Sequence, residues 1–254
     1  MNRDTGPGDH ALATQLAAEA GSLLLRLRRE LGDVAPDERG AQGDRRSHQL
    51  LVRCLGEVRP ADAVLSEEAV DDPARLDSAR VWVIDPLDGT REYADGRDDW
   101  AVHVALVADG GLVAGAVSVP CLSTTFSTRP PPAVPPREEG RALRMAVSRS
   151  RAPEVARTVA RRLGAELVPM GSAGYKAMAV VRGEVDAYVH AGGLYEWDSA
   201  APVAVALAAG LHASRLDGSP LRYNRPGAWL PDLVICRSEL AGIVIEAASA
   251  ASQA

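Results

Sequence analysis

The sequence predicts a layered α/β fold whose sheets mix parallel and antiparallel strands. Alternation in residues 101–107, a Gly110-Gly111 turn and an apolar run at 112–119 together indicate an antiparallel hairpin. Residues 143–209 instead alternate between helical and extended patterns, as α/β architectures do. We therefore expect alternating layers of helices and sheets, with a functional site where the two halves of the chain meet.

The first elements of the chain have helical patterns. Regularly spaced leucines among alanines and charges predict an amphipathic helix at residues 10–31 that covers the core. The acidic, glycine-containing residues 32–43 are expected to form a loop, after which Asp44 caps a second helix that continues through Leu55. Two short apolar strands follow, at residues 63–66 and 81–84.

Residues 130–136 hold five prolines in seven positions, which predicts an extended surface loop. A ligand for a proline-binding module is the alternative. The loop marks a boundary between residues 1–140 and 141–254, which we expect to form one compact unit. Further strands are expected at residues 143–147 and 187–189, and helices at residues 153–163, 173–182 and 198–209.

Composition excludes several functional classes. With 254 residues and 46% hydrophobic content, the chain is long enough to bury a large core. The net charge of -6 argues against a protein that binds a nucleic-acid polymer. Cys54, Cys121 and Cys236 lie far apart without metal-ligand spacing, so we expect reduced thiols and a cytoplasmic location. No run is long enough to span a bilayer, and no membrane association is expected.

The stretch Asp85-Pro86-Leu87-Asp88-Gly89-Thr90 carries the most chemical information. It follows the apolar run at 81–84, so both carboxylates are expected at the carboxyl end of a buried strand. Pro86 fixes φ and Gly89 admits unusual backbone angles, so the turn can aim both carboxylates into one small volume. Oxygen ligands without a nearby Cys or His favour Mg²⁺, Mn²⁺ or Ca²⁺. Taken alone, the hexapeptide also suits an acidic surface turn.

Acidic residues also follow another strand and begin another helix. Glu67 and Glu68 come directly after the strand at 63–66, and Asp198 lies at the start of an alanine-rich helix. Asp198 alone would suit an N-cap as well as a metal ligand. Together with the two aspartates of the hexapeptide, Glu67 and Asp198 would place four carboxylates in one pocket. That is more negative charge than a site tolerates without divalent cations.

Three motifs in this order resemble the inositol monophosphatase superfamily of lithium-sensitive, magnesium-dependent phosphatases. They are Ser-Glu-Glu at 66–68, Asp-Pro-Leu-Asp-Gly-Thr at 85–90 and Trp-Asp-Ser-Ala-Ala at 197–201. The resemblance extends from about Asp44 to the end of the chain. It implies an α-β-α-β-α sandwich, as in fructose-1,6-bisphosphatase, and a homodimer that acts on a small phosphorylated molecule.

The resemblance also implies the metal ligands. Glu67, Asp85 and the carbonyl of Leu87 would hold one Mg²⁺, and Asp85, Asp88 and Asp198 a second. Glu67 would also contact a third, looser ion. We also expect that Mn²⁺ can substitute for Mg²⁺ and that Li⁺ inhibits the reaction. Two such ions would neutralise a doubly charged phosphate monoester and generate a nucleophile at neutral pH.

The resemblance assigns the remaining catalytic roles to residues beside these ligands. Asp44 and Thr90 would orient and deprotonate the attacking water. Glu67 is expected to be a catalytic residue as well as a metal ligand. The backbone N–H groups of Gly89 and Thr90 would cradle the phosphate. Most of the metal ligands therefore come from residues 1–140, whereas residues 141–254 would supply Asp198 and the substrate pocket.

Residues 171–176 and Asp186-Ala187-Tyr188 resemble the segments of the family that line the substrate pocket, which places Ser172 there. Relatives that act on inositol phosphates usually carry a carboxylate two residues after Asp-Ala-Tyr, but this chain has His190. His190 is therefore a candidate substrate contact. An ordinary polar residue at a strand end is the alternative.

Lys176, Ser148 and Arg149 would add cationic and hydroxyl donors that suit a second phosphate far from the metals. With residues 217–224, the Ser-Arg-Ser tract at 148–150 resembles the CysQ branch, whose members remove the 3'-phosphate of 3'-phosphoadenosine 5'-phosphate to leave AMP in sulfate assimilation. Ordinary surface positions are the alternative for Lys176 and Arg149.

Two questions stay open at this point. Residues 37–43 lack the lysine that relatives usually carry there, so the ligands of a third metal are undefined, with Asp37 and Glu38 as candidates. The same machinery would also suit an inositol 1-phosphate or fructose 1,6-bisphosphate phosphatase. A non-catalytic regulator that binds metal or nucleotide is a more distant alternative, because mere binding needs neither Asp44 nor Thr90.

Overall fold

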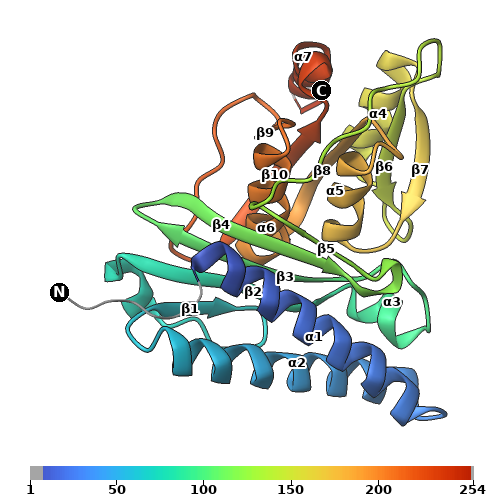
Figure 1. Ribbon diagram of the computed structural model, residues 1–254. Helices are drawn as coiled ribbons and strands as arrows, with labels where there is room; N and C mark the ends of the chain where they lie inside the picture. Colours follow the sequence, from blue (N-terminus) through green and yellow to red (C-terminus); the bar gives the residue numbers. More distant parts are fainter. Residues whose placement is uncertain (1–7, 253–254) are drawn as a thin grey trace.

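The computed structural model describes residues 8–252, which form two five-stranded sheets in a layered α/β arrangement (Figure 1). In the first sheet β1 pairs parallel to β2, and the other strands are antiparallel. In the second sheet β6 runs parallel to β7 and β8, and β10 is antiparallel to β8 and β9. The predicted mixed sheets are therefore confirmed. The first sheet has the order β1 (Ala63–Ser66), β2 (Arg80–Asp88), β3 (Ala101–Ala108), β4 (Gly111–Val119), β5 (Thr124–Ser127), and the second β7 (Glu166–Met170), β6 (Arg144–Ser148), β8 (Ala187–Tyr195), β10 (Trp229–Cys236), β9 (His212–Ser214).

Helices cover both faces of each sheet, so that five layers alternate along the molecule (Figure 1). Helices α1 (Asp9–Leu31) and α2 (Pro36–Val58) pack on the outer face of the first sheet, around buried leucines and the ring of Trp82. Helices α5 (Ala173–Val181) and α6 (Glu196–Ala208) lie between the two sheets in the central core. Helices α4 (Glu154–Leu163) and α7 (Ala241–Ser252) cover the far face of the second sheet.

The expected loop at residues 32–43 is confirmed only for residues 32–35 and is wrong beyond them, because α2 begins at Pro36. Proline suits the first turn of a helix. The negative charges of Asp37 and Glu38 in that turn interact favourably with the positive end of the helix dipole. The glycines that suggested a loop serve close packing instead: a Cβ on Gly43 would lie 2.8 Å from a methyl group of Leu87. Asp44 is therefore inside α2 and does not cap it.

The later elements also depart from the expected bounds. Strand β8 continues to Tyr195, and α6 begins at Glu196, so Asp198 is in the first helical turn and is not the N-cap residue. Its carboxylate nevertheless accepts a hydrogen bond from the Tyr195 N–H at 2.7 Å, which satisfies a donor at the helix start. The sequence analysis missed β5, β7, β9, β10, the short helix α3 (Thr90–Ala94) and α7.

The proline-rich segment at residues 130–136 has neither helix nor strand and is mostly exposed, as predicted. It leads from β5 of the first sheet to β6 of the second. Within residues 8–252, no helix is both long enough and apolar enough to cross a membrane.

Candidate active site

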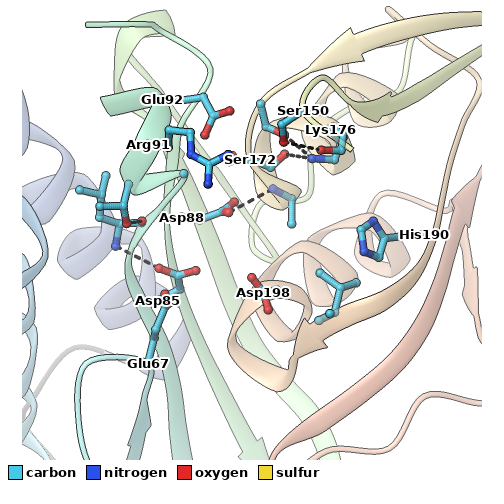
Figure 2. Close-up of a pocket in the computed structure, with 18 of the residues that line it drawn as sticks. Glu67, Asp85, Asp88, Arg91, Glu92, Ser150, Ser172, Lys176, His190 and Asp198 are labelled. Atoms are coloured by element: carbon cyan, nitrogen blue, oxygen red, sulfur yellow. Dashed lines mark hydrogen bonds between the residues drawn. The ribbon is translucent and has the colours of Figure 1, made fainter. Parts of the chain in front are cut away.

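Three aspartates from the two halves of the chain meet in one place. Asp85 and Asp88 lie at the end of β2, where the pairing with β3 shifts register between them, and Asp198 comes from α6. A carboxylate oxygen of each lies within 4.8 Å of the others (Figure 2). Gly89, at φ 91°, turns the chain directly after Asp88 in a conformation that glycine adopts readily. The hexapeptide thus aims both of its carboxylates towards Asp198.

This cluster suits a bound cation. Asp85 is only 1% exposed; its Oδ1 accepts a hydrogen bond from the Leu87 N–H at 3.0 Å, but no donor within residues 8–252 reaches Oδ2. Burial and the Glu67 carboxylate raise the pKa of Asp85 well above its usual range, and burial with the Asp88 charge raises the pKa of both Glu67 and Asp198 to about 7. The residues present therefore fit an oxygen-coordinated divalent cation.

Asp88 is held in place from two sides. Its carboxylate oxygens accept hydrogen bonds from the N–H groups of Ala173 (3.1 Å) and Gly174 (2.6 Å), at the start of α5. On the other side, Nε2 of the fully buried His103 lies 3.1 Å from Oδ2 of Asp88. Burial alone would raise the pKa of Asp88, but the His103 ring, the Lys176 charge and the Gly174 N–H lower it. Asp88 thus stays charged with a fixed orientation.

His103 also contacts the helix that carries Asp198. Its Nδ1 lies 2.9 Å from the carbonyl oxygen of Trp197, and because a carbonyl can only accept, Nδ1 donates. The ring fits only because residue 174 is glycine, where a Cβ would lie 2.0 Å from Nε2. Burial alone would lower the pKa of His103, but the Asp88 carboxylate raises it. The sequence analysis missed this residue, whose one signal is a polar side chain inside an apolar strand.

Asp44 and Thr90 form a hydrogen-bonded pair beside the acid cluster. The Thr90 hydroxyl donates to Asp44 Oδ1 at 3.0 Å and lies 3.2 Å from the Leu87 carbonyl oxygen. Burial, together with the charge of Glu68, raises the pKa of Asp44 to about 7. A carboxylate with such a pKa can accept a proton near neutral pH, so the pair suits general-base chemistry.

The acids open into a cavity of about 380 Å³ between the two halves (Figure 2). Asp44 reaches this cavity only through Thr90, and Arg149 does not line it. The cavity is also lined by Tyr188 and Ser150, which belong to motifs named in the sequence analysis, and by Arg91, Glu92 and Gly193, which do not. The assigned residues that line it are Glu67, Asp85, Leu87, Asp88, Gly89, Thr90, Ser148, Ser172, Lys176, His190 and Asp198.

Lys176 lines the cavity but is only 4% exposed. Its ammonium donates to the carbonyl oxygens of Gly171 and, at 2.7 Å, Ser172, and it lies 5.3 Å from the ring centre of Tyr188. Burial lowers the pKa of this lysine to about 8. Its donors are used to fix the turn that precedes α5, the helix whose N–H groups hold Asp88. The alternative of an ordinary surface position is therefore wrong for Lys176.

Arg149 and His190 differ in their relation to the cavity. The Arg149 guanidinium pairs with Asp99 and lies 3.9 Å from Glu92, away from the acid cluster. His190 Nε2 lies 2.7 Å from the carbonyl oxygen of Gly192. Burial lowers the pKa of His190 to about 4, so the imidazole is neutral near pH 7 and carries its proton on Nε2.

The comparisons with known proteins agree with this geometry. The model of the inositol monophosphatase family matches residues 10–253. A 3'-phosphoadenosine 5'-phosphate phosphatase of Mycobacterium leprae is 51% identical over 254 residues, covering 93% of this chain and 92% of its own length. The 3'(2'),5'-bisphosphate nucleotidase CysQ of Escherichia coli is 28% identical, covering 83% of this chain and 92% of its own length.

Solved structures show the same fold. The structure of CysQ from Bacteroides thetaiotaomicron, a bacterial member of the inositol monophosphatase family, superimposes with a TM-score of 0.74 at 27% identity, covering 89% of this chain and 96% of its own. The suppressor protein SuhB from Bartonella henselae reaches a TM-score of 0.76 at 21% identity, covering 96% of this chain and 99% of its own, and supports the fold alone. Enzymes of the matched family use divalent metal ions, in keeping with the acid cluster. The chain belongs to the inositol monophosphatase family.

Proposed function

We propose that the chain is a Mg²⁺-dependent phosphomonoesterase that removes the 3'-phosphate of 3'-phosphoadenosine 5'-phosphate and leaves AMP. The observation that carries this proposal is the buried cluster of Asp85, Asp88 and Asp198, in which Asp85 Oδ2 has no donor within residues 8–252. The cluster lines a cavity together with cationic residues and with Thr90, whose hydroxyl donates to Asp44. The names of the relatives at 51% and 52% identity favour this nucleotide as the substrate. The neutral His190 disfavours inositol phosphates, because relatives that take them usually carry a carboxylate there.

The metal ligands of the proposal are the residues that the motifs suggested. Glu67, Asp85 and the carbonyl of Leu87 would hold one Mg²⁺, and Asp85, Asp88 and Asp198 a second. Bound ions would supply charge neutralisation of the phosphate and a water of lowered pKa. Mn²⁺ is expected to substitute, Li⁺ to inhibit, and Glu67 to contact a third ion.

The side chains around these ligands would direct the hydrolysis. Because the Thr90 hydroxyl donates to Asp44, its lone pairs can accept a proton from the attacking water. The proton passes through Thr90 to Asp44 as the water oxygen bonds to phosphorus. The bond between phosphorus and the 3'-oxygen breaks, and that oxygen leaves as a hydroxyl after taking a proton from solvent. The N–H groups of Gly89 and Thr90 would hold the phosphate during this in-line step.

The proposal extends to the assembly. Because the acid cluster takes Asp85 and Asp88 from residues 1–140 and Asp198 from residues 141–254, the two halves would act as one catalytic unit. A cytoplasmic homodimer is the expected form. Light scattering of the purified protein tests this point, and a monomer at assay concentrations would contradict it.

A substrate panel tests the function. Phosphate release in Mg²⁺ is measured from 3'-phosphoadenosine 5'-phosphate, inositol 1-phosphate and fructose 1,6-bisphosphate, each as kcat/KM, with a chelated sample as the control. The nucleotide is expected to give the highest kcat/KM, and the chelator to abolish release. Efficient turnover of inositol 1-phosphate without release from the nucleotide would overturn the substrate assignment, and undiminished release after chelation would overturn the metal dependence.

A further inference from the structure

A second cavity, of about 970 Å³, adjoins the acid-lined cavity. The two share five lining residues, so they form one continuous cleft. The second cavity has three arginines and one carboxylate in its wall, whereas the first is dominated by acids. The shared residues are Arg91, Ser148, Ser150, His190 and Gly193, and the second cavity adds Arg151, Glu154 and Arg157 among others.

The three arginines are not equivalent. Arg157 is committed, because its Nε donates to Glu154 at 3.0 Å. In contrast, the guanidinium groups of Arg91 and Arg151 have no hydrogen bond or ion pair with any residue in the part of the chain that the structure describes. Both residues are exposed, and Figure 2 shows Arg91 pointing into the cleft. These two guanidinium groups are therefore available to an anion.

Local backbone structure places Arg151 against strand β8. The Arg151 N–H donates to the Ser148 hydroxyl at 3.4 Å, in the turn between β6 and α4. An Nη atom of Arg151 lies 4.0 Å from where a Cβ on Gly193 would be. Gly192 and Gly193 have φ of 77° and 75°, which glycine adopts without strain, and they leave this part of the cleft free of side chains.

We propose that this second cavity is the subsite for the non-reacting phosphate of a bisphosphorylated substrate, with Arg151 as the specificity-determining residue and Arg91 at the junction of the two cavities. The proposal rests on the phosphatase function given above. Guanidinium groups bind phosphate through paired, charge-assisted hydrogen bonds, and the hydroxyls of Ser148 and Ser150 add further donors. Arg149 pairs with Asp99 and lines neither cavity, and the buried Lys176 donates to two backbone carbonyls and does not line the second cavity, so neither residue fills this role.

The subsite would also select which phosphate reacts. The carboxylates of the acid cluster repel any phosphate that is not bound to a metal ion. The non-reacting phosphate is therefore more stable at the arginine end of the cleft. With the 5'-phosphate at Arg151, the nucleoside spans the cleft and presents its 3'-phosphate to Asp85, Asp88 and Asp198. Arg151 would therefore lower KM more than it changes kcat.

The test compares two substrates in Mg²⁺: the 3',5'-bisphosphate of adenosine and adenosine 3'-phosphate, which lacks the distal phosphate. Arg151→Gln is expected to lower kcat/KM for the bisphosphate by about 10- to 100-fold, mainly through KM, and to lower that for the monophosphate far less. Arg151→Lys should recover part of the loss. Arg162→Gln is the matched control, because Arg162 is an exposed arginine of α4 that lines neither cavity.

Binding of AMP gives a readout that does not depend on turnover. AMP retains the distal phosphate and lacks the reacting one, so Arg151→Gln should weaken AMP binding by calorimetry while leaving adenosine binding unchanged. If the wild-type enzyme releases no phosphate from the bisphosphate, the proposed function fails. If it prefers the bisphosphate and Arg151→Gln keeps the ratio of the two kcat/KM values, the subsite is wrong even though the function stands.

Discussion

The two ends of the cleft are built on opposite principles. At the acidic end, Asp85 and Asp88 are buried and held by backbone N–H groups and the His103 ring, so their positions are fixed before any ligand arrives. At the other end, Arg91 and Arg151 are exposed and unpaired within residues 8–252. Side chains with fixed positions suit the reaction itself, because catalysis tolerates little misplacement of the reacting groups. Exposed cationic side chains suit the recognition of a substrate anion. Substitutions at the acidic end should therefore change kcat or metal affinity, and those at the other end KM.

The largest effect is expected for Asp85→Asn. Because Asp85 would contact both ions, its loss should lower kcat by a factor on the order of 1,000 or more. The folded protein without metal should be no less stable, since the substitution removes a buried charge whose Oδ2 has no donor within residues 8–252. Steady-state kinetics and thermal unfolding measure the two outcomes. A variant with wild-type kcat would remove Asp85 from the reaction.

A smaller effect on metal binding is expected for His103→Gln. Glutamine cannot bridge Asp88 and the Trp197 carbonyl as the ring does, so the two proposed metal ligands Asp88 and Asp198 lose their common support. Affinity for Mn²⁺ should therefore fall by about 10- to 100-fold. Calorimetry of the metal-free protein measures this change.

Val104→Ala on the same strand is the control for that prediction. Val104 is fully buried and packs on the side of α1 and α2, so its truncation should destabilise the fold by about 1–3 kcal/mol without changing metal affinity. Equal losses of metal affinity in the two variants would mean that His103 acts only through general stability.

The pH dependence of the reaction should report on Asp44. Its pKa is raised to about 7 by burial, so the group is protonated below that pH and cannot accept a proton. At saturating Mg²⁺, kcat/KM should fall about tenfold for each pH unit below 7 and level off above it. A profile that is flat between pH 5.5 and 8 would argue against Asp44 as the base.

The smallest effect is expected for Arg149→Gln. Its guanidinium is 34% exposed and pairs with Asp99, which keeps Arg97 as a second partner. The substitution should therefore lower stability by about 1 kcal/mol or less and change kcat/KM by less than about fivefold. Measuring kcat/KM for Arg149→Gln and Arg151→Gln under the same conditions shows which of the two neighbouring arginines contacts the substrate. A larger loss of kcat/KM at Arg149 would reverse their assignment.

Local features of the sequence predicted the acidic end well. The hexapeptide at 85–90 encodes its own geometry, because a buried strand, a proline and a glycine fix the turn within a few residues. The hairpin at 101–119 followed from its alternation and its Gly-Gly turn in the same way. Motifs with this property can be interpreted without knowledge of the tertiary structure.

Features that depend on distant packing could not be predicted. The glycines of α2 suggested a loop because their partners, such as Leu87, are remote in sequence. His103 has no local motif, and its role exists only where β3, α5 and α6 meet. The commitment of Lys176 to nearby carbonyls and the availability of Arg151 likewise depend on the fold around them.

The most direct test of the account is anomalous diffraction from a crystal soaked in Mn²⁺. The account predicts two strong peaks, one between Glu67, Asp85 and the Leu87 carbonyl and one between Asp85, Asp88 and Asp198, with the second lost in Asp198→Asn. A soaked crystal without a peak among these carboxylates would contradict the metal site, and with it the proposed chemistry.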